Sequence, residues 1–128
     1  MSGNRFGHID LRVKNGQEAF AFYSKLLPEL GFTRSFHGGG WYVFATEGEL
    51  PQAAYFAVTE DPNHVPNANR IAFWASSPAE VDRIAGVVAQ AGGRHIEAPG
   101  KQPYSATYYA VYFEDPSGNR FEVYHRMN

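Results

Sequence analysis

The feature that most constrains the fold of this chain is an internal repeat. Residues 5–13 alternate apolar and polar side chains, which is typical of a half-buried strand, and a helical pattern of apolar residues follows. The same order returns 62 residues later without a gap, and an offset of 67 aligns the last strands of the two halves. The aligned pairs include Ile9 with Ile71, Leu11 with Phe73, Phe22 with Ile84, Leu26 with Val88, Gly31 with Gly93, and Phe56 with Val123. We infer a duplicated unit.

Each half predicts a βαβββ unit. In the first half we expect a helix with apolar residues from Ala19 to Leu30, tightened by Pro28 in its last turn. In the second half the helix begins at Ser77-Pro78-Ala79-Glu80, which offers an N-cap and a capping box, and ends at Gly92-Gly93. The strands are expected at residues 5–13, 31–36, 41–46 and 52–58, and again at 70–75, 94–98, 106–113 and 119–125.

These elements predict an α+β fold. We expect one domain over residues 1–128, in which module one spans 4–58 and module two spans 70–126. Between them, residues 59–69 have the polar, proline-containing composition of a linker.

Composition excludes several classes of function. The 128 residues carry 11 Lys and Arg against 13 Asp and Glu, so no basic surface for nucleic acid or an anionic membrane is expected. The chain has no cysteine, which excludes disulfides, thiol nucleophiles and iron–sulfur clusters, and it has no apolar run long enough to span a membrane. We take the cytoplasm as the default location. The 10 Phe, 8 Tyr and 2 Trp exceed the needs of one small core, which favours an aromatic-lined cavity or interface, although strand packing explains them equally well.

Strand alternation selects four polar residues for the face opposite the helices. Apolar positions such as Ile9, Ile71 and Phe121 should pack under the helices, so their neighbours should point the other way, into a concave face between the modules. These neighbours are His8, Tyr55, Arg70 and Glu122. The two offsets pair His8 with Arg70 and Tyr55 with Glu122.

Three motifs carry a family resemblance: Gly7-His8-Ile9, Arg70-Ile71-Ala72-Phe73, and Asp115-Pro116-Ser117-Gly118-Asn119-Arg120-Phe121-Glu122. With them the chain resembles the vicinal oxygen chelate superfamily of glyoxalase I, bleomycin-resistance proteins, fosfomycin-resistance proteins and extradiol dioxygenases. The stretch from Ala98 to Ala110 is similar to a small glyoxalase-like subgroup. The resemblance implies two tandem βαβββ modules that form a curved mixed sheet with a concave cavity.

The resemblance also implies a divalent metal such as Zn, Ni, Mn or Fe, held by inward His and Glu residues. His8 and Glu122 match that ligand pattern, whereas Tyr55 and Arg70 do not, and a guanidinium has no lone pair to donate. Two hypotheses follow. Either His8 and Glu122 hold a metal, or Arg70 replaces the ion as the positive group while His8 serves as general acid or base. A third interpretation is a purely structural Arg70–Glu122 ion pair.

For function, the resemblance implies a small-molecule protein with either lyase, isomerase or dioxygenase-like chemistry at His8, Arg70 and Glu122, or metal-free binding of an antibiotic-like ligand. A vestigial fold retained for protein interaction is a third possibility. We expect Trp41, Tyr55, Tyr104 and Tyr109 to contact the ligand, since they lie in aromatic strands or loops beside the cavity. The resemblance further implies a homodimer, and no nucleic-acid or membrane partner is expected.

Overall fold

The computed structural model describes residues 4–49 and 51–127. Its first half contains strand β1 (His8–Val13), helix α1 (Gly16–Leu26), the 3-10 turn η1 (Leu27–Leu30), and strands β2 (Arg34–Gly38), β3 (Trp41–Ala45) and β4 (Tyr55–Glu60). The second half contains strand β5 (Arg70–Trp74), helix α2 (Pro78–Ala91), and strands β6 (Arg94–Lys101), β7 (Tyr109–Glu114) and β8 (Arg120–His125).

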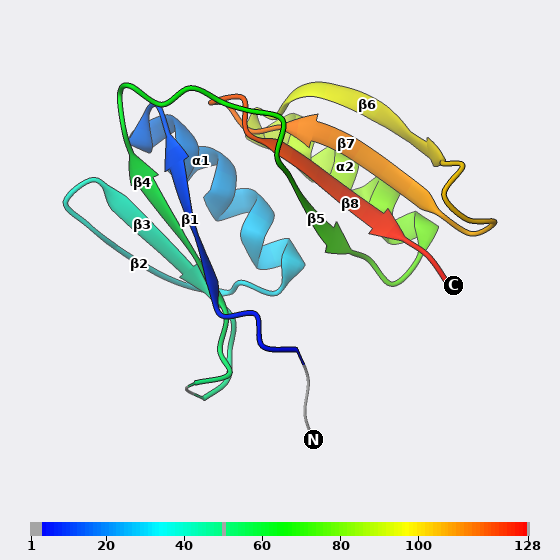
Figure 1. Cartoon of the computed structure of the whole chain (residues 1–128), viewed down its shortest axis with the longest axis horizontal. Helices are drawn as coiled ribbons and strands as arrows, with labels where there is room; N and C mark the ends of the chain where they lie inside the picture. Colours follow the sequence, from blue (N-terminus) through cyan, green and yellow to red (C-terminus); the bar gives the residue numbers. More distant parts are fainter. Residues whose placement is uncertain (1–3, 50, 128) are drawn as a thin grey trace.

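Each module forms its own four-stranded mixed sheet, backed by one helix. The strand orders are β1-β4-β3-β2 and β5-β8-β7-β6, and in each sheet the first pair is parallel while the others are antiparallel. Figure 1 shows the two modules side by side, with α1 behind the first sheet and α2 behind the second. The predicted α+β fold of two tandem βαβββ modules is confirmed. Within the described residues, β1 and β5 remain edge strands, and no ladder joins the sheets.

The helix boundaries follow from capping chemistry. The Asn15 side chain accepts from the Glu18 N–H at 2.9 Å, and Ser77 accepts from the Glu80 N–H at 3.1 Å. Pro28 turns the end of the first helix into η1, and Gly31 then ends it with a φ of 96°. The predicted N-cap at Ser77 and the predicted tightening at Pro28 are confirmed.

Strands β1, β4 and β7 each begin three residues later than predicted, and β4 extends to Glu60. The differences at β2 and β6 have a clear physical reason. We expected a strand over 31–36, but β2 begins at Arg34 because η1 and Gly31 occupy the residues before it. We expected a loop through Pro99-Gly100, whereas β6 continues to Lys101 with two shifts in its register against β7. Such bulges let a strand stay paired through a segment whose side chains do not alternate regularly between apolar and polar, which is why the sequence pattern did not predict it.

The registers correct one detail of the repeat. His8 pairs with Tyr55 in the first sheet, and Arg70 pairs with Arg120 in the second, so the position equivalent to Tyr55 is Arg120 rather than Glu122. Our offset of 67 therefore places the last strand two residues too far along. A shift of two residues leaves every side chain on its predicted face, which is why the pattern could not reveal it.

One continuous core lies between the sheets and the helices. Val13, Phe56, Phe121 and Val123 are almost fully buried, and Phe73 packs against them, as the alternation predicted. Helices α1 and α2 also contact each other, so the two modules share this core. No helix within the described residues is long and apolar enough to cross a membrane.

A buried carboxylate connects the modules. Asp115 is 0% exposed and lies in the turn between β7 and β8. The hydroxyl of Tyr23, on α1 and equally buried, donates to its Oδ2 at 2.6 Å. The backbone N–H groups of Ser117 and Asn119 donate to the other oxygen at 2.8 and 2.9 Å, so this buried charge is compensated by hydrogen bonds.

The same turn also holds the end of β1. The Asn119 amide donates to Asp115 and to the backbone carbonyl of Arg12, both at 2.9 Å. The backbone N–H of Lys14 donates to the Ser117 hydroxyl at 2.9 Å. The Asp-Pro-Ser-Gly-Asn motif thus fixes module two against module one.

We predict that Tyr23→Phe lowers the free energy of unfolding by about 1–3 kcal/mol at pH 7, because a buried donor to Asp115 is lost. Burial first, and then Asp115, raise the pKa of Tyr23 well above its usual value. The tyrosine of the unfolded chain ionises at about pH 10. The stabilisation of the folded protein by the Tyr23–Asp115 hydrogen bond is therefore complete below that pH and is lost as the pH rises above it. Urea unfolding from pH 7 to 11 should show the two proteins converging above pH 10, and a constant difference would contradict the assignment.

Candidate active site on the outer face of the second sheet

The face of the second sheet opposite α2, here called the outer face, is assembled by strand register. Arg70 lies beside Arg120, and Glu122 lies between Ala72 of β5 and Tyr112 of β7. One step further along the strands, Trp74 lies beside Tyr124. Alternation puts these side chains on one surface, since their neighbours Phe73, Phe121 and Val123 pack into the core.

Glu122 is held by a tyrosine. Its side chain is nearly buried, and the Tyr108 hydroxyl donates a short hydrogen bond to its Oε2. Tyr108 also stacks on Tyr124, with ring centroids 5.1 Å apart. Burial, followed by the bond to Glu122, raises the pKa of Tyr108, which extends to more alkaline pH the range in which the phenol is protonated and donates.

Arg70 rests on a second tyrosine. Its guanidinium carbon lies 4.8 Å from the ring centroid of Tyr112, in a cation–π contact. Burial, followed by a hydrogen bond with Tyr104 and the charge of Glu122, raises the pKa of Tyr112. The structural Arg70–Glu122 ion pair that the sequence allowed is not formed, since no ion pair of Arg70 is found among the described residues. Arg70 lies against the ring of Tyr112 instead, and Glu122 accepts from Tyr108.

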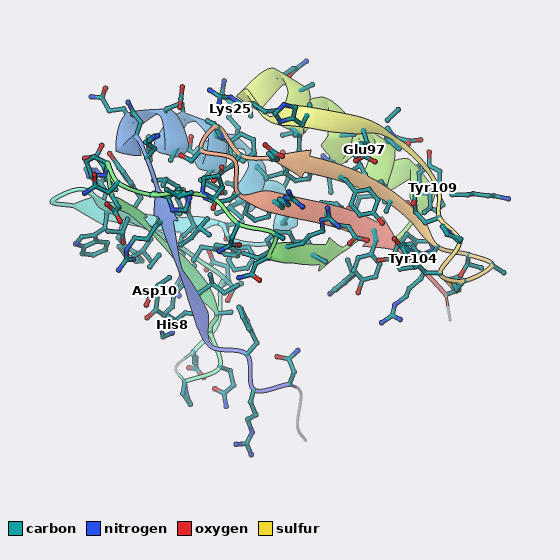
Figure 2. The ribbon with its side chains drawn as sticks, turned by 45° about the horizontal axis from the view of Figure 1, so that its top comes forward. His8, Asp10, Lys25, Glu97, Tyr104 and Tyr109 are labelled. Atoms are coloured by element: carbon teal, nitrogen blue, oxygen red, sulfur yellow. The ribbon has the colours of Figure 1, made fainter. Side chains whose placement is uncertain are left out.

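His8 lies on the outer face of the first sheet instead. Its ring stacks on Tyr55, its register partner, with centroids 4.5 Å apart and planes 4° apart, and its Nε2 lies 3.9 Å from Asp10. Figure 2 shows His8 and Asp10 on β1, across the molecule from Tyr104. The structure therefore brings Arg70 and Glu122 to one sheet and His8 and Tyr55 to the other.

The remaining predicted ligand contacts divide between the two faces. Trp41 pairs with Thr59 on the outer face of the first sheet and is 44% exposed, and Tyr104 lies edge-on against Tyr108. Tyr109, in contrast, donates to Asp82 on α2 at 2.6 Å and packs against the core. Our expectation for Tyr109 does not match this placement, since alternation gives the outer position to its neighbour Tyr108.

The residues present do not fit a divalent metal. Such ions take three or more His, Asp or Glu ligands in protein sites, and the described part of the chain contains no cluster of three potential His, Cys, Asp or Glu ligands. The third expected position carries Arg70, which cannot donate a lone pair, and Glu122 already accepts from Tyr108. We therefore derive no chemistry through a metal ion.

Comparison with known proteins places this geometry in a family. Residues 5–123 match the family described as the Glyoxalase/Bleomycin resistance protein/Dioxygenase superfamily. The chain belongs to this superfamily. A comparison with curated proteins gave no significant match.

Solved structures of this superfamily share the fold. A glyoxalase/bleomycin resistance protein from Albidiferax ferrireducens T118 is 27% identical, with a TM-score of 0.76 over 96% of this chain and 100% of that one. A glyoxalase-related enzyme from Fulvimarina pelagi is 17% identical, with a TM-score of 0.76 over 96% and 88%. The fosfomycin resistance protein FosX from Mesorhizobium loti is 18% identical, with a TM-score of 0.68 over 99% and 95%.

Sequence reasoning did not foresee two tyrosine contacts of this site, the bond of Tyr108 to Glu122 and the contact of Tyr112 with Arg70. The signal for Tyr112 was present, because Val111 and Phe113 are the buried neighbours that place it on the outer face. Tyr108 precedes β7, and its bond to Glu122 depends on how the chain approaches the strand. No local pattern in the sequence specifies that approach.

We predict that Tyr108→Phe lowers the free energy of unfolding by about 1.5–3 kcal/mol at pH 7, because the nearly buried Glu122 carboxylate loses its donor. Tyr55→Phe is the matched control. It removes the same hydroxyl from the other outer face and keeps the stack on His8, so it should change stability by less than about 0.5 kcal/mol. Equal effects of the two variants in urea unfolding would show that the Tyr108–Glu122 bond contributes nothing.

Proposed function

We propose that this chain binds a small organic anion on the outer face of the second sheet, without a metal ion. Arg70 is the positive group that receives the anion, and the Glu122–Tyr108 pair is a neighbouring polar anchor. The observation that carries the proposal is the state of Arg70, whose guanidinium is positioned by Tyr112 and has no carboxylate partner among the described residues. A fixed guanidinium of this kind suits carboxylate or phosphate oxygens.

A pocket beside Arg70 supports this function. It has a volume of about 250 Å³ and includes Arg70, Arg120 and Tyr112 in its lining. Two acids also line it: Glu114 is engaged by His95 Nδ1 at 2.8 Å, and Glu97 is the register partner of Tyr112. The volume lies slightly below the usual range for ligand pockets, which favours a small ligand such as a phosphorylated or dicarboxylic acid.

The proposal is limited to binding, because no candidate general acid or base among the described residues of the same chain has been placed beside Arg70. His8, our sequence candidate for general acid or base, lies in the other sheet and not beside Arg70. The Tyr108 proton is already donated to Glu122, so this pair offers acceptor oxygens, which suit a ligand hydroxyl next to the anionic group.

To test this, we would titrate oxalate, phosphate and phosphoglycolate into the protein by calorimetry. We expect saturable binding of at least one of them and a loss of about tenfold or more in affinity with Arg70→Gln, as for a charge-assisted hydrogen bond. Arg12→Gln is the matched control, because it removes an exposed arginine from the first sheet. Absence of binding by all three anions, or equal effects of the two variants, would contradict the proposal.

We also propose that the chain forms a homodimer through the groove between the two sheets. This groove has a volume of about 660 Å³ and lies along the edge strands β1 and β5, which lack a second partner strand among the described residues. Its apolar lining includes the exposed Phe6 and the half-buried Ile9, Leu30 and Ile71. Unpaired edges beside an apolar groove favour pairing with another strand, and a second copy offers the same two edges.

Sedimentation at micromolar concentration should give the mass of a dimer. Phe6→Lys should shift it toward the monomer, because the substitution places a charge in the groove. A monomeric wild-type protein would remove the proposal.

A further inference from the structure

We infer a second ligand site at the ends of β5 and β8, formed by Trp74, Tyr124 and Arg126, and we assign it to a planar aromatic carboxylate. The site is separate from the Arg70 pocket, since the two pockets share no lining residue. Nothing in the anion binding proposed above requires these three residues.

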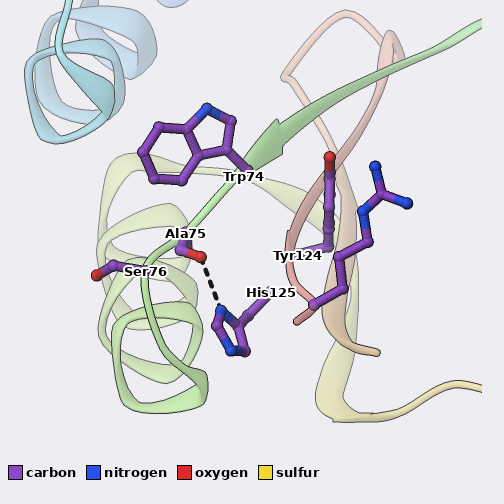
Figure 3. Close-up of a pocket in the computed structure, with 6 residues that line it drawn as sticks. Trp74, Ala75, Ser76, Tyr124 and His125 are labelled. Atoms are coloured by element: carbon purple, nitrogen blue, oxygen red, sulfur yellow. Dashed lines mark hydrogen bonds between the residues drawn. The ribbon is translucent and has the colours of Figure 1, made fainter. Parts of the chain in front are cut away.

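The two aromatic side chains stand next to each other without touching. Trp74 and Tyr124 are register partners on adjacent parallel strands, so they project from the same face. The structure gives no ring contact between them, and a pocket of about 410 Å³ lies there, with both residues in its lining. Figure 3 shows the indole of Trp74 and the ring of Tyr124 apart from each other, among the side chains that line this pocket. The volume is sufficient for a ligand of one or two fused rings.

The fold itself does not require this pair. The equivalent register partners in module one are Arg12 and Thr59, and that module forms the same sheet without an aromatic residue at either position. The indole of Trp74 is nevertheless 73% exposed. Tyr124 is held in place by its stack on Tyr108. A large exposed indole beside a fixed phenol provides two apolar surfaces for a planar ring.

Charge selects the class of ligand. The guanidinium carbon of Arg126 lies 5.6 Å from the Tyr124 ring centroid, and no Asp or Glu is among the pocket-lining residues. His125 also lines the pocket, and its Nδ1 donates to the Ala75 carbonyl at 3.0 Å, because a carbonyl can only accept. The described lining therefore contains one cation, Arg126, and no carboxylate.

The adjacent acid is already compensated. Glu80 accepts from the Ser76 N–H at 2.8 Å and from the Ser76 hydroxyl at 3.0 Å, and its other oxygen lies 3.6 Å from Arg83. Its charge is therefore bound on α2 and does not occupy Arg126. An anionic group attached to an aromatic ring satisfies both parts of the site, with the ring on Trp74 and Tyr124 and the carboxylate at Arg126.

The chain carries two tryptophans, Trp41 and Trp74, so its indole N–H signals in NMR spectra are few and can be assigned with Trp41→Phe. We would titrate 2-naphthoate and its neutral analogue 2-naphthamide into the wild-type protein. We expect a saturable shift of the Trp74 signal, with the acid binding about fivefold or more tightly than the amide, and Arg126→Gln removing that preference.

Arg12→Gln, which changes the equivalent edge of the first sheet, should leave naphthoate binding unchanged. An unmoved Trp74 signal, equal binding of acid and amide, or an unchanged preference in Arg126→Gln would overturn the assignment. Arg70→Gln separates the two sites, because it should weaken the small anions of the first pocket and not naphthoate. Trp74 also borders the groove proposed for the dimer, so sedimentation of each variant shows whether its oligomeric state has changed.

Discussion

The structure depends on one buried charge, the carboxylate of Asp115. A carboxylate that is 0% exposed is costly unless donors surround it, and here Tyr23, Ser117 and Asn119 supply them. These donors come from both modules. The hydrogen bonds that stabilise the charge therefore also connect α1 and the end of β1 to the turn between β7 and β8, and they set the position of β8, which carries Glu122.

On this common framework the two modules have diverged at their outer faces. The first sheet carries His8 stacked on Tyr55, whereas the second carries Arg70 on Tyr112 and Glu122 bound by Tyr108. Substitution on an outer face leaves the helix-backed core intact, because alternate residues serve the two faces separately. A duplicated superfamily module can thus gain a binding surface on one sheet at little cost to folding.

The aromatic surplus is divided in the same way. Phe22, Phe56 and Phe121 fill the core between the helices and the sheets. Tyr108 and Tyr112 position the two charged groups of the second outer face, while Trp74 is left largely exposed at its end. The count of aromatic residues alone could not separate these roles.

The sequence predicts well what depends on periodicity and capping. The faces of Ile71 and Phe121, the N-cap at Ser77 and the turn at Pro28 all follow from local patterns, and the structure agrees. Register is harder to predict, because a shift of two residues leaves every side chain on the same face. The repeat therefore made Glu122 the equivalent of Tyr55, whereas the strand pairing makes Arg120 its equivalent. Alternation could place Tyr112 on the outer face but not show that Arg70 lies against it, and the bond of Tyr108 to Glu122 was beyond prediction because Tyr108 precedes β7.

The central claim is that Arg70 takes the place of a metal ion on the second outer face. Its most direct test is to measure phosphoglycolate binding before and after dialysis against a chelator, with Zn, Ni, Mn and Fe determined in both samples by mass spectrometry. We expect metal well below one equivalent per chain and an unchanged affinity. One equivalent of metal per chain, retained by the wild-type protein and lost in Glu122→Gln together with binding, would contradict the account.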